Sequence, residues 1–158
     1  MRDETAALPR TWPKTLLLLL ATMAWVLFWY WDTARAMAAI WARSDTYAHA
    51  FVVPPISLWL IWRKRNDLAL LRPEPTFWFV LPLAATVFFW LMGELTAVNA
   101  LTQFALVVTL ILTIISILGV RVSRQIAFPL AFLLLCVPIG EFMTPTLMEW
   151  TAWFTVLV

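Results

Sequence analysis

The chain has 158 residues, of which 63% are hydrophobic and 13% are charged, whereas ordinary globular domains have roughly 45–50% apolar and about 25% charged residues. A soluble domain of this size could not cover so much apolar surface, so we exclude soluble, disordered, collagen-like and disulfide-rich secreted proteins. The net charge of +2 comes from basic residues spread along the chain, which indicates membrane topology rather than nucleic-acid binding. The sequence predicts an all-α, polytopic transmembrane helical bundle, with residues 1–158 forming the N-terminal part of a single multispan domain.

Five segments are long and apolar enough to approach the length of a transmembrane helix. About 20 helical residues cross the roughly 30 Å hydrocarbon core of a bilayer. The first segment holds five consecutive leucines, and the short second and fifth segments each contain two prolines. An Ala-Arg-Ala sequence at residues 34–36 resembles a signal-peptide cleavage site, but the long apolar stretch before it favours a retained span. We predict spans at residues 12–31, 47–62, 77–92, 98–118 and 126–139.

A further apolar run, residues 150–158, reaches the last residue without a polar flank. Natural spans usually close with snorkelling or interfacial residues. We therefore expect the chain to be part of a longer protein. We also expect the helix from about residue 141 onward to be truncated or to lie in the membrane interface.

The distribution of basic residues predicts the orientation. Nine Lys and Arg residues lie in the N-terminal segment and in the second and fourth predicted loops, and two lie in the first loop. By the positive-inside rule, the N-terminus is cytoplasmic and the first, third and fifth loops face outward.

The only histidine, His49, lies where the first loop enters the second predicted span. An ionisable residue at this position is a functional candidate, and Asp45 would share its face if a helix begins this early. The alternative is structural, with His49 anchoring the span at the interface and Asp45 capping its start. Because no cluster of cysteine and histidine residues occurs, the sequence predicts no metal site and no cofactor.

The single cysteine, Cys136, is surrounded by leucine and valine, without a basic residue nearby. Such surroundings disfavour the thiolate that a nucleophile requires. We predict that Cys136 is a small buried hydrophobic residue and not the catalytic nucleophile.

Several other polar residues lie in the predicted exterior loops or at span ends. Three glutamates have no paired acidic partner for general acid–base chemistry, and we interpret them as loop charges: Glu94, Glu141 and Glu149. Asn99 and Gln103 are expected to join helices rather than bind substrate. The Pro-Glu-Pro sequence at residues 73–75 predicts a helix-breaking loop. Most of the eleven tryptophans lie near predicted span ends, which is typical of an interfacial aromatic belt.

Two motifs, in this order, resemble the exosortase family, and exosortase A most closely. The first is RSDTYAHAFVVPPISLWLIWRKR at residues 43–65. The second is FPLAFLLLCVPIGEF at residues 128–142, followed by TPTLMEWTAWFTV at residues 144–156. The resemblance extends over most of the chain.

The resemblance implies a cysteine peptidase or transpeptidase of the bacterial inner membrane. Its partners would be membrane lipid and exported proteins that carry a C-terminal sorting signal, made of a Pro-Glu-Pro motif, a transmembrane helix and a basic cluster. Such systems accompany exopolysaccharide production. A thiolate would attack a backbone carbonyl of the signal, assisted by a histidine and an arginine.

The sequence departs from the family in one decisive respect. The family's cysteine lies in a Glu-Ala-Cys-Ser-Gly-like motif, and no such motif occurs in these 158 residues. The resemblance places Cys136 and His49 at other family positions, so the catalytic residues are expected beyond Val158 and this chain alone is predicted to be inactive. The alternative is an inactive multispan transporter or assembly scaffold.

Overall fold

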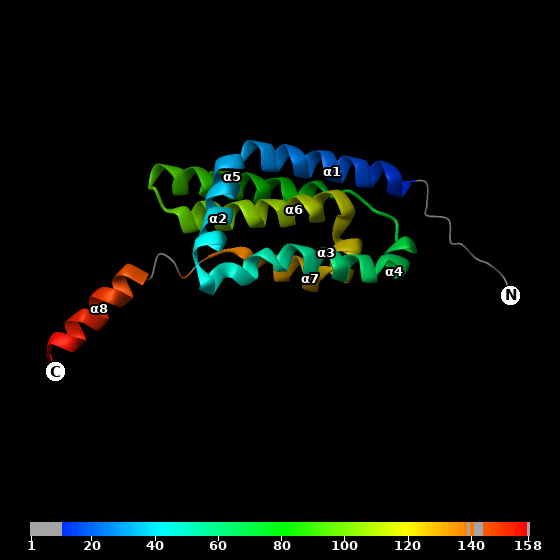
Figure 1. Cartoon of the computed structure of the whole chain (residues 1–158). Helices are drawn as coiled ribbons and strands as arrows, with labels where there is room; N and C mark the ends of the chain where they lie inside the picture. The colour runs from blue at the N-terminus through cyan, green and yellow to red at the C-terminus, as the bar shows by residue number, and fades with distance from the viewer. Residues whose placement is uncertain (1–10, 139, 141–143, 158) are drawn as a thin grey trace.

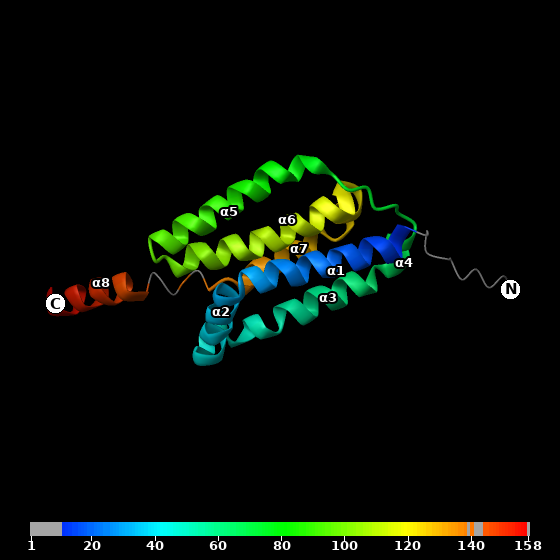
Figure 2. The ribbon, with the colours of Figure 1, turned by 90° about the horizontal axis from the view of Figure 1, so that it is seen from above.

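The computed structural model describes residues 11–138, 140 and 144–157, and all regular secondary structure in these residues is helical. Five segments run side by side in alternating directions (Figures 1 and 2). They are built on α1 (Thr11–Trp29), α3 (Val53–Arg63), α5 (Val80–Leu95), α6 (Asn99–Gln125) and α7 (Ala127–Phe132). The predicted all-α transmembrane bundle is confirmed.

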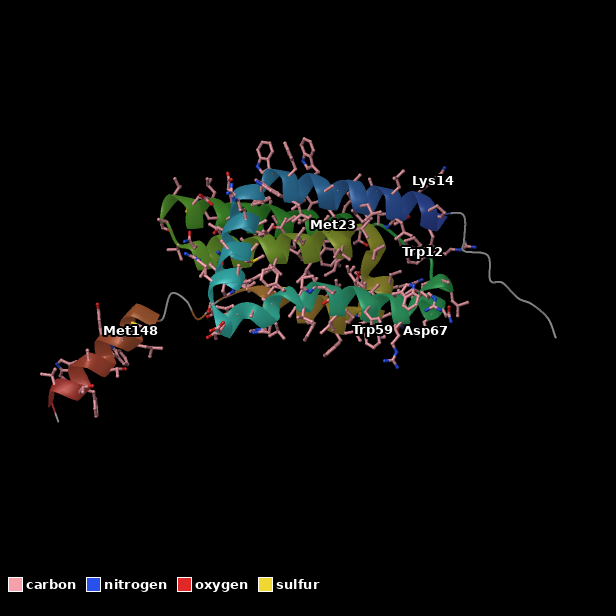
Figure 3. All side chains as sticks on the ribbon, viewed as in Figure 1. Trp12, Lys14, Met23, Trp59, Asp67 and Met148 are labelled. Atoms are coloured by element: carbon pink, nitrogen blue, oxygen red, sulfur yellow. The ribbon has the colours of Figure 1, made fainter. Side chains whose placement is uncertain are left out.

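The two ends of the bundle differ in charge. The start of α1, the short helix α4 (Arg65–Ala69) and the end of α6 lie together, and we call this the basic end (Figures 1 and 2). Figure 3 shows Lys14 and Asp67 at this end. The opposite end holds helix α2 (Trp31–Arg43) and the α5–α6 turn, and we call it the cleft end. Loops that sequence analysis assigned to opposite sides of a membrane therefore lie at opposite ends of the bundle.

Within the described residues, three helical segments are long and apolar enough to cross a membrane: Trp12–Trp29, Phe77–Leu95 and Asn99–Gln125. They correspond to the predicted first, third and fourth spans. The predicted second span is instead a 3-10 helix, η1 (Asp45–Phe51), followed by α3, which has proline within its first two positions. Proline favours the first turn of a helix because its missing N–H would be unpaired there. The predicted fifth span is α7 followed by a 3-10 turn, η3 (Leu133–Cys136). The crossing of these two composite segments remains a prediction.

Helix α2 runs across the cleft end of the bundle (Figure 2), where sequence analysis placed only a loop. Its buried residues are Thr33, Met37 and Ile40, at the spacing of one helical face. Two tryptophans on this end hold it: Trp90 Nε1 donates to Thr33 Oγ1 at 3.1 Å, and Trp41 Nε1 donates to the Cys136 carbonyl at 2.9 Å. Hydrophobic length does not reveal this helix, because its 13 residues include Asp32, Arg35 and Arg43 and are too few to span a membrane.

Helices α5 and α6 form a closely packed hairpin. The hydroxyl oxygens of Thr86 and Thr109 lie 2.9 Å apart between the two helices. On α6, Leu106 is completely buried in the bundle core. Hydroxyl contacts and small side chains are typical of helix association in membranes, where apolar burial gives little preference for protein over lipid.

The tryptophans divide into two groups. Exposed tryptophans occur near the ends of α1 and α3, as the belt interpretation expects: Trp25, Trp29, Trp59 and Trp62. Trp59 points outward from the bundle in Figure 3. Trp12, Trp41 and Trp90 are instead at least partly buried and make hydrogen bonds between segments, such as Trp12 Nε1 to the Leu71 carbonyl at 2.9 Å.

At the basic end, residues 73–76 form an extended segment that we call the strap. The Glu74 N–H donates to the Leu118 carbonyl at 3.3 Å, and the Thr76 N–H donates to the Ser116 carbonyl at 2.9 Å. Helix α6 is interrupted beside the strap at Gly119, where φ is 80° and ψ is 163°. The predicted helix-breaking loop is thus confirmed, and it joins α6 through backbone hydrogen bonds.

Helix α8 (Thr144–Leu157) stands apart from the bundle beyond the cleft end (Figures 1 and 2). Its side chains from residue 147 to residue 156 are all exposed, and most of them are apolar. Its place in the membrane interface remains a prediction.

Candidate binding cleft

A cleft of about 650 Å³ opens at the cleft end of the bundle. Its walls come from segments far apart in the sequence: α2, the α5–α6 turn, the first turns of α6, and Pro138. Four alanines lie on these walls, namely Ala36, Ala39, Ala97 and Ala100. Because alanine side chains are short, they leave the cleft open where larger residues would fill it.

The α5–α6 turn has a defined helix-terminating geometry. The Val98 N–H donates to the Gly93 carbonyl at 2.9 Å, and the Ala97 N–H donates to the Glu94 carbonyl at 3.2 Å. This is the Schellman pattern, in which the residue after the C-cap adopts a left-handed conformation. Ala97 does so with φ of 55°, where glycine is the usual residue. The turn therefore fixes one wall of the cleft by backbone geometry.

Three polar side chains line the cleft: Arg43, Asn99 and Gln103. Arg43 is exposed at the end of α2; its Nε donates to the Ala39 carbonyl at 3.2 Å, and no ion pair to it occurs in the described residues. Gln103 is 1% exposed, and its Nε2 has no hydrogen-bond partner. Asn99 begins α6, whose N-terminus carries partial positive charge. The cleft thus presents several hydrogen-bond donors and one full positive charge.

A side-chain hydrogen bond between α5 and α6 is formed by Thr86 and Thr109, whereas Gln103 Nε2 makes no hydrogen bond. The expectation that Asn99 and Gln103 join helices stays a prediction.

His49 and Asp45 do not form a pair. Both are exposed in η1, and a 3-10 helix with three residues per turn places residues four apart on different faces. His49 Nδ1 lies 2.8 Å from the carbonyl oxygen of Thr46, three residues earlier. This local contact does not distinguish the two roles, so the functional and the structural interpretations of His49 both stay predictions. No group of three histidine, cysteine or acidic residues within the described part of the chain could hold a metal ion.

Of the glutamates in the predicted exterior loops, Glu94 and Glu149 do not line the cleft. Glu94 and Glu149 are exposed, and Glu141 lies outside the described residues. Their interpretation as loop charges therefore stays a prediction.

Cys136 is 3% exposed, and its Sγ lies 3.8 Å from the Ala50 carbonyl. We expect N-ethylmaleimide to modify this thiol at least about tenfold more slowly in the folded protein than after unfolding in dodecyl sulfate, because reaction needs an exposed thiolate. Mass spectrometry of the peptide containing Cys136 would measure both rates. Equal rates in the two conditions would contradict the buried, unreactive role.

Chemically, the cleft can bind oxygen acceptors but lacks a nucleophile. Guanidinium and amide groups donate hydrogen bonds to carboxylates and carbonyls. The described residues place no thiol or histidine among the lining residues. The geometry supports recognition rather than bond cleavage by these residues themselves.

Residues 41–158 match the model of a protein family described as transmembrane exosortase. No curated protein and no solved structure shows significant similarity to the chain. The match includes α3 and the α5–α6 hairpin. Of the cleft's α2 wall it includes only Arg43, since Ala36, Ala39 and Ile40 precede residue 41.

Proposed function

The chain belongs to the transmembrane exosortase family, and from this membership we propose that it forms the N-terminal part of a membrane cysteine peptidase or transpeptidase. Its substrates would be exported proteins that carry a C-terminal Pro-Glu-Pro sorting signal, processed in the bacterial inner membrane alongside exopolysaccharide production. The family match over residues 41–158 is the observation that carries this proposal.

In this proposal the basic end faces the cytoplasm and the cleft end faces outward. Seven Lys and Arg residues belong to the described part of the basic end: Lys14, Arg63, Lys64, Arg65, Arg72, Arg121 and Arg124. At the cleft end, α2 contributes Arg35 and Arg43. This asymmetry favours a cytoplasmic basic end and gives the cleft access to exported substrates.

The proposed division of labour assigns recognition to the bundle and bond cleavage to residues that follow it. A cysteine thiolate would attack the substrate carbonyl, and an arginine would stabilise the negative charge that develops on its oxygen. The peptide C–N bond would then break to leave a thioester, with a histidine protonating the departing amine, and water or another amine would cleave the thioester. We place these three groups beyond Val158, because the expected Glu-Ala-Cys-Ser-Gly-like motif is absent from residues 1–158.

The proposal is tested by processing in cells of the source bacterium that lack the gene. We expect a reporter with a C-terminal Pro-Glu-Pro signal to stay full-length in these cells and to be shortened when the full gene product is restored, as measured by immunoblotting. Replacing Cys136 by Ala should leave at least about half of the processing, because this buried thiol is not the nucleophile. Unchanged reporter length with the restored gene product would contradict the peptidase function and favour a transporter or scaffold.

A further inference from the structure

We propose that the cleft between α2 and the α5–α6 turn is a binding site for an extended peptide that carries an acidic side chain. Arg43 would bind the carboxylate, and Gln103 would bind a peptide group of the main chain. This inference rests on the proposed function in one respect only, namely that the bound peptide would be the substrate's sorting signal.

The polar groups of the cleft select for a ligand with oxygen acceptors. The guanidinium of Arg43 has donors beyond the Nε that binds Ala39, and no carboxylate pairs with it in the described residues. The start of α6, at Asn99, adds the positive end of a helix dipole. A carboxylate placed here would form charge-assisted hydrogen bonds, which are stronger than neutral ones.

The buried amide of Gln103 is the second, independent observation. Buried polar atoms are almost always hydrogen-bonded, and an unpaired one costs free energy. Gln103 Nε2 is such an atom, and its side chain belongs to the cleft wall. A primary amide can donate and accept at once, as a peptide group does. An extended main chain in the cleft would thus satisfy the amide that the isolated fold leaves unpaired.

A peptide fits these features better than an anionic lipid headgroup does. Sites for lipid headgroups are typically clusters of several Lys and Arg residues, and such a cluster occurs at the opposite, basic end of this bundle. The cleft has a single lining cation, Arg43, and its other walls carry alanine methyl groups. A weakly charged cleft lined by short side chains suits a main chain with small side chains.

The experiment measures peptide binding to the full gene product in phosphatidylcholine nanodiscs. Two fluorescent peptides with blocked termini, containing Ala-Pro-Glu-Pro-Ala or Ala-Pro-Gln-Pro-Ala, are compared by anisotropy. We expect the Glu peptide to bind about tenfold more tightly than the Gln peptide, because only it offers a carboxylate to Arg43. R43Q should remove this preference by weakening binding of the Glu peptide about tenfold, with the Gln peptide changed less than about twofold.

Replacing Gln103 by Leu should weaken both peptides about fivefold, because their main chains are the same. The same substitution should leave the thermal unfolding midpoint equal or higher, since it removes an unpaired buried amide. This combination separates a binding role from a structural one. The matched controls are R35Q, on the same helix but outside the cleft, and Q125L, at the other end of α6; both should bind as wild type.

Equal affinity for the two peptides, absent binding, or R43Q behaving like R35Q would each overturn the inference. Loss of the peptide preference in nanodiscs containing phosphatidylglycerol would show that the cleft is a lipid site instead. The outcomes also separate the two proposals. Reporter processing without an Arg43-dependent preference overturns only the cleft assignment, whereas such a preference without processing overturns only the peptidase function.

Discussion

Replacing Gly119 by Ala is expected to destabilise the protein by about 3 kcal/mol or more. Gly119 combines φ of 80° with ψ of 163°, a region of backbone space that is essentially restricted to glycine. A Cβ at this position would also collide with the Glu74 carbonyl oxygen of the strap. A small rotation of the backbone would not relieve the strained conformation or the collision. It would break the hydrogen bonds of Glu74 to Leu118 and of Thr76 to Ser116.

The measurement is thermal unfolding in detergent, followed by tryptophan fluorescence. For a protein of this size a loss of 3 kcal/mol corresponds to a midpoint about 6–12 °C lower. V120A is the matched control, since Val120 is the next residue and is 38% exposed; its midpoint should fall by less than about 2 °C. A midpoint for G119A that equals that of V120A would show that the strap does not constrain α6.

Hydrophobic length predicted the long helices well. The predicted spans 12–31, 77–92 and 98–118 begin within three residues of α1, α5 and α6. Side chains of these helices face lipid or the bundle interior, so nearly every position is apolar and the signal is strong. The fourth prediction ended at residue 118, one residue before the interruption of α6 at Gly119, because the polar residues that follow resemble a loop.

The cleft could not be predicted in the same way, because its residues come together only through the fold. Arg43, Ala97, Gln103 and Pro138 lie on separate segments. Arg43 already had a local explanation as a topology charge, and Gln103 had one as a helix contact. One usable signal was present: apolar or small residues at positions 33, 37 and 40 recur with helical spacing and indicate α2. Recognising α2 would have placed Arg43 at the end of a helix across the bundle.

Replacing Gly93 by Leu is expected to lower stability by about 3 kcal/mol, since overpacking a close contact typically costs about 1–3 kcal/mol. Gly93 lies on α5 where it meets the start of α6. A Cβ there would be 2.7 Å from Thr102 Cγ2 and 3.0 Å from the Thr102 backbone nitrogen. The Thr102 side chain cannot turn away freely, because its hydroxyl donates to the Asn99 carbonyl at 2.8 Å. The two helices would have to separate.

Intrinsic helix propensity favours replacing Gly93, whereas the close contact with Thr102 opposes it. Glycine costs about 1 kcal/mol relative to alanine inside a helix. G93A gains this propensity while adding only one carbon near Thr102, so it should lose less stability than G93L. A85L, on an exposed position of the same helix, adds a similar side chain without the contact. Its midpoint should stay within about 2 °C of wild type, while that of G93L falls by about 6–12 °C.

G93L should also affect the cleft, because Gly93 helps to close the α5–α6 turn. Gly93 accepts the hydrogen bond from Val98 that closes the α5–α6 turn, and this turn carries the Ala97 and Asn99 walls of the cleft. Because helix separation at Gly93 would displace that turn, G93L should weaken binding of the acidic peptide about fivefold at a temperature where the variant is still folded. Wild-type stability of G93L would contradict the close approach of α5 and α6. Wild-type affinity in a destabilised G93L would show that the peptide depends on α2 and Gln103 and not on the turn.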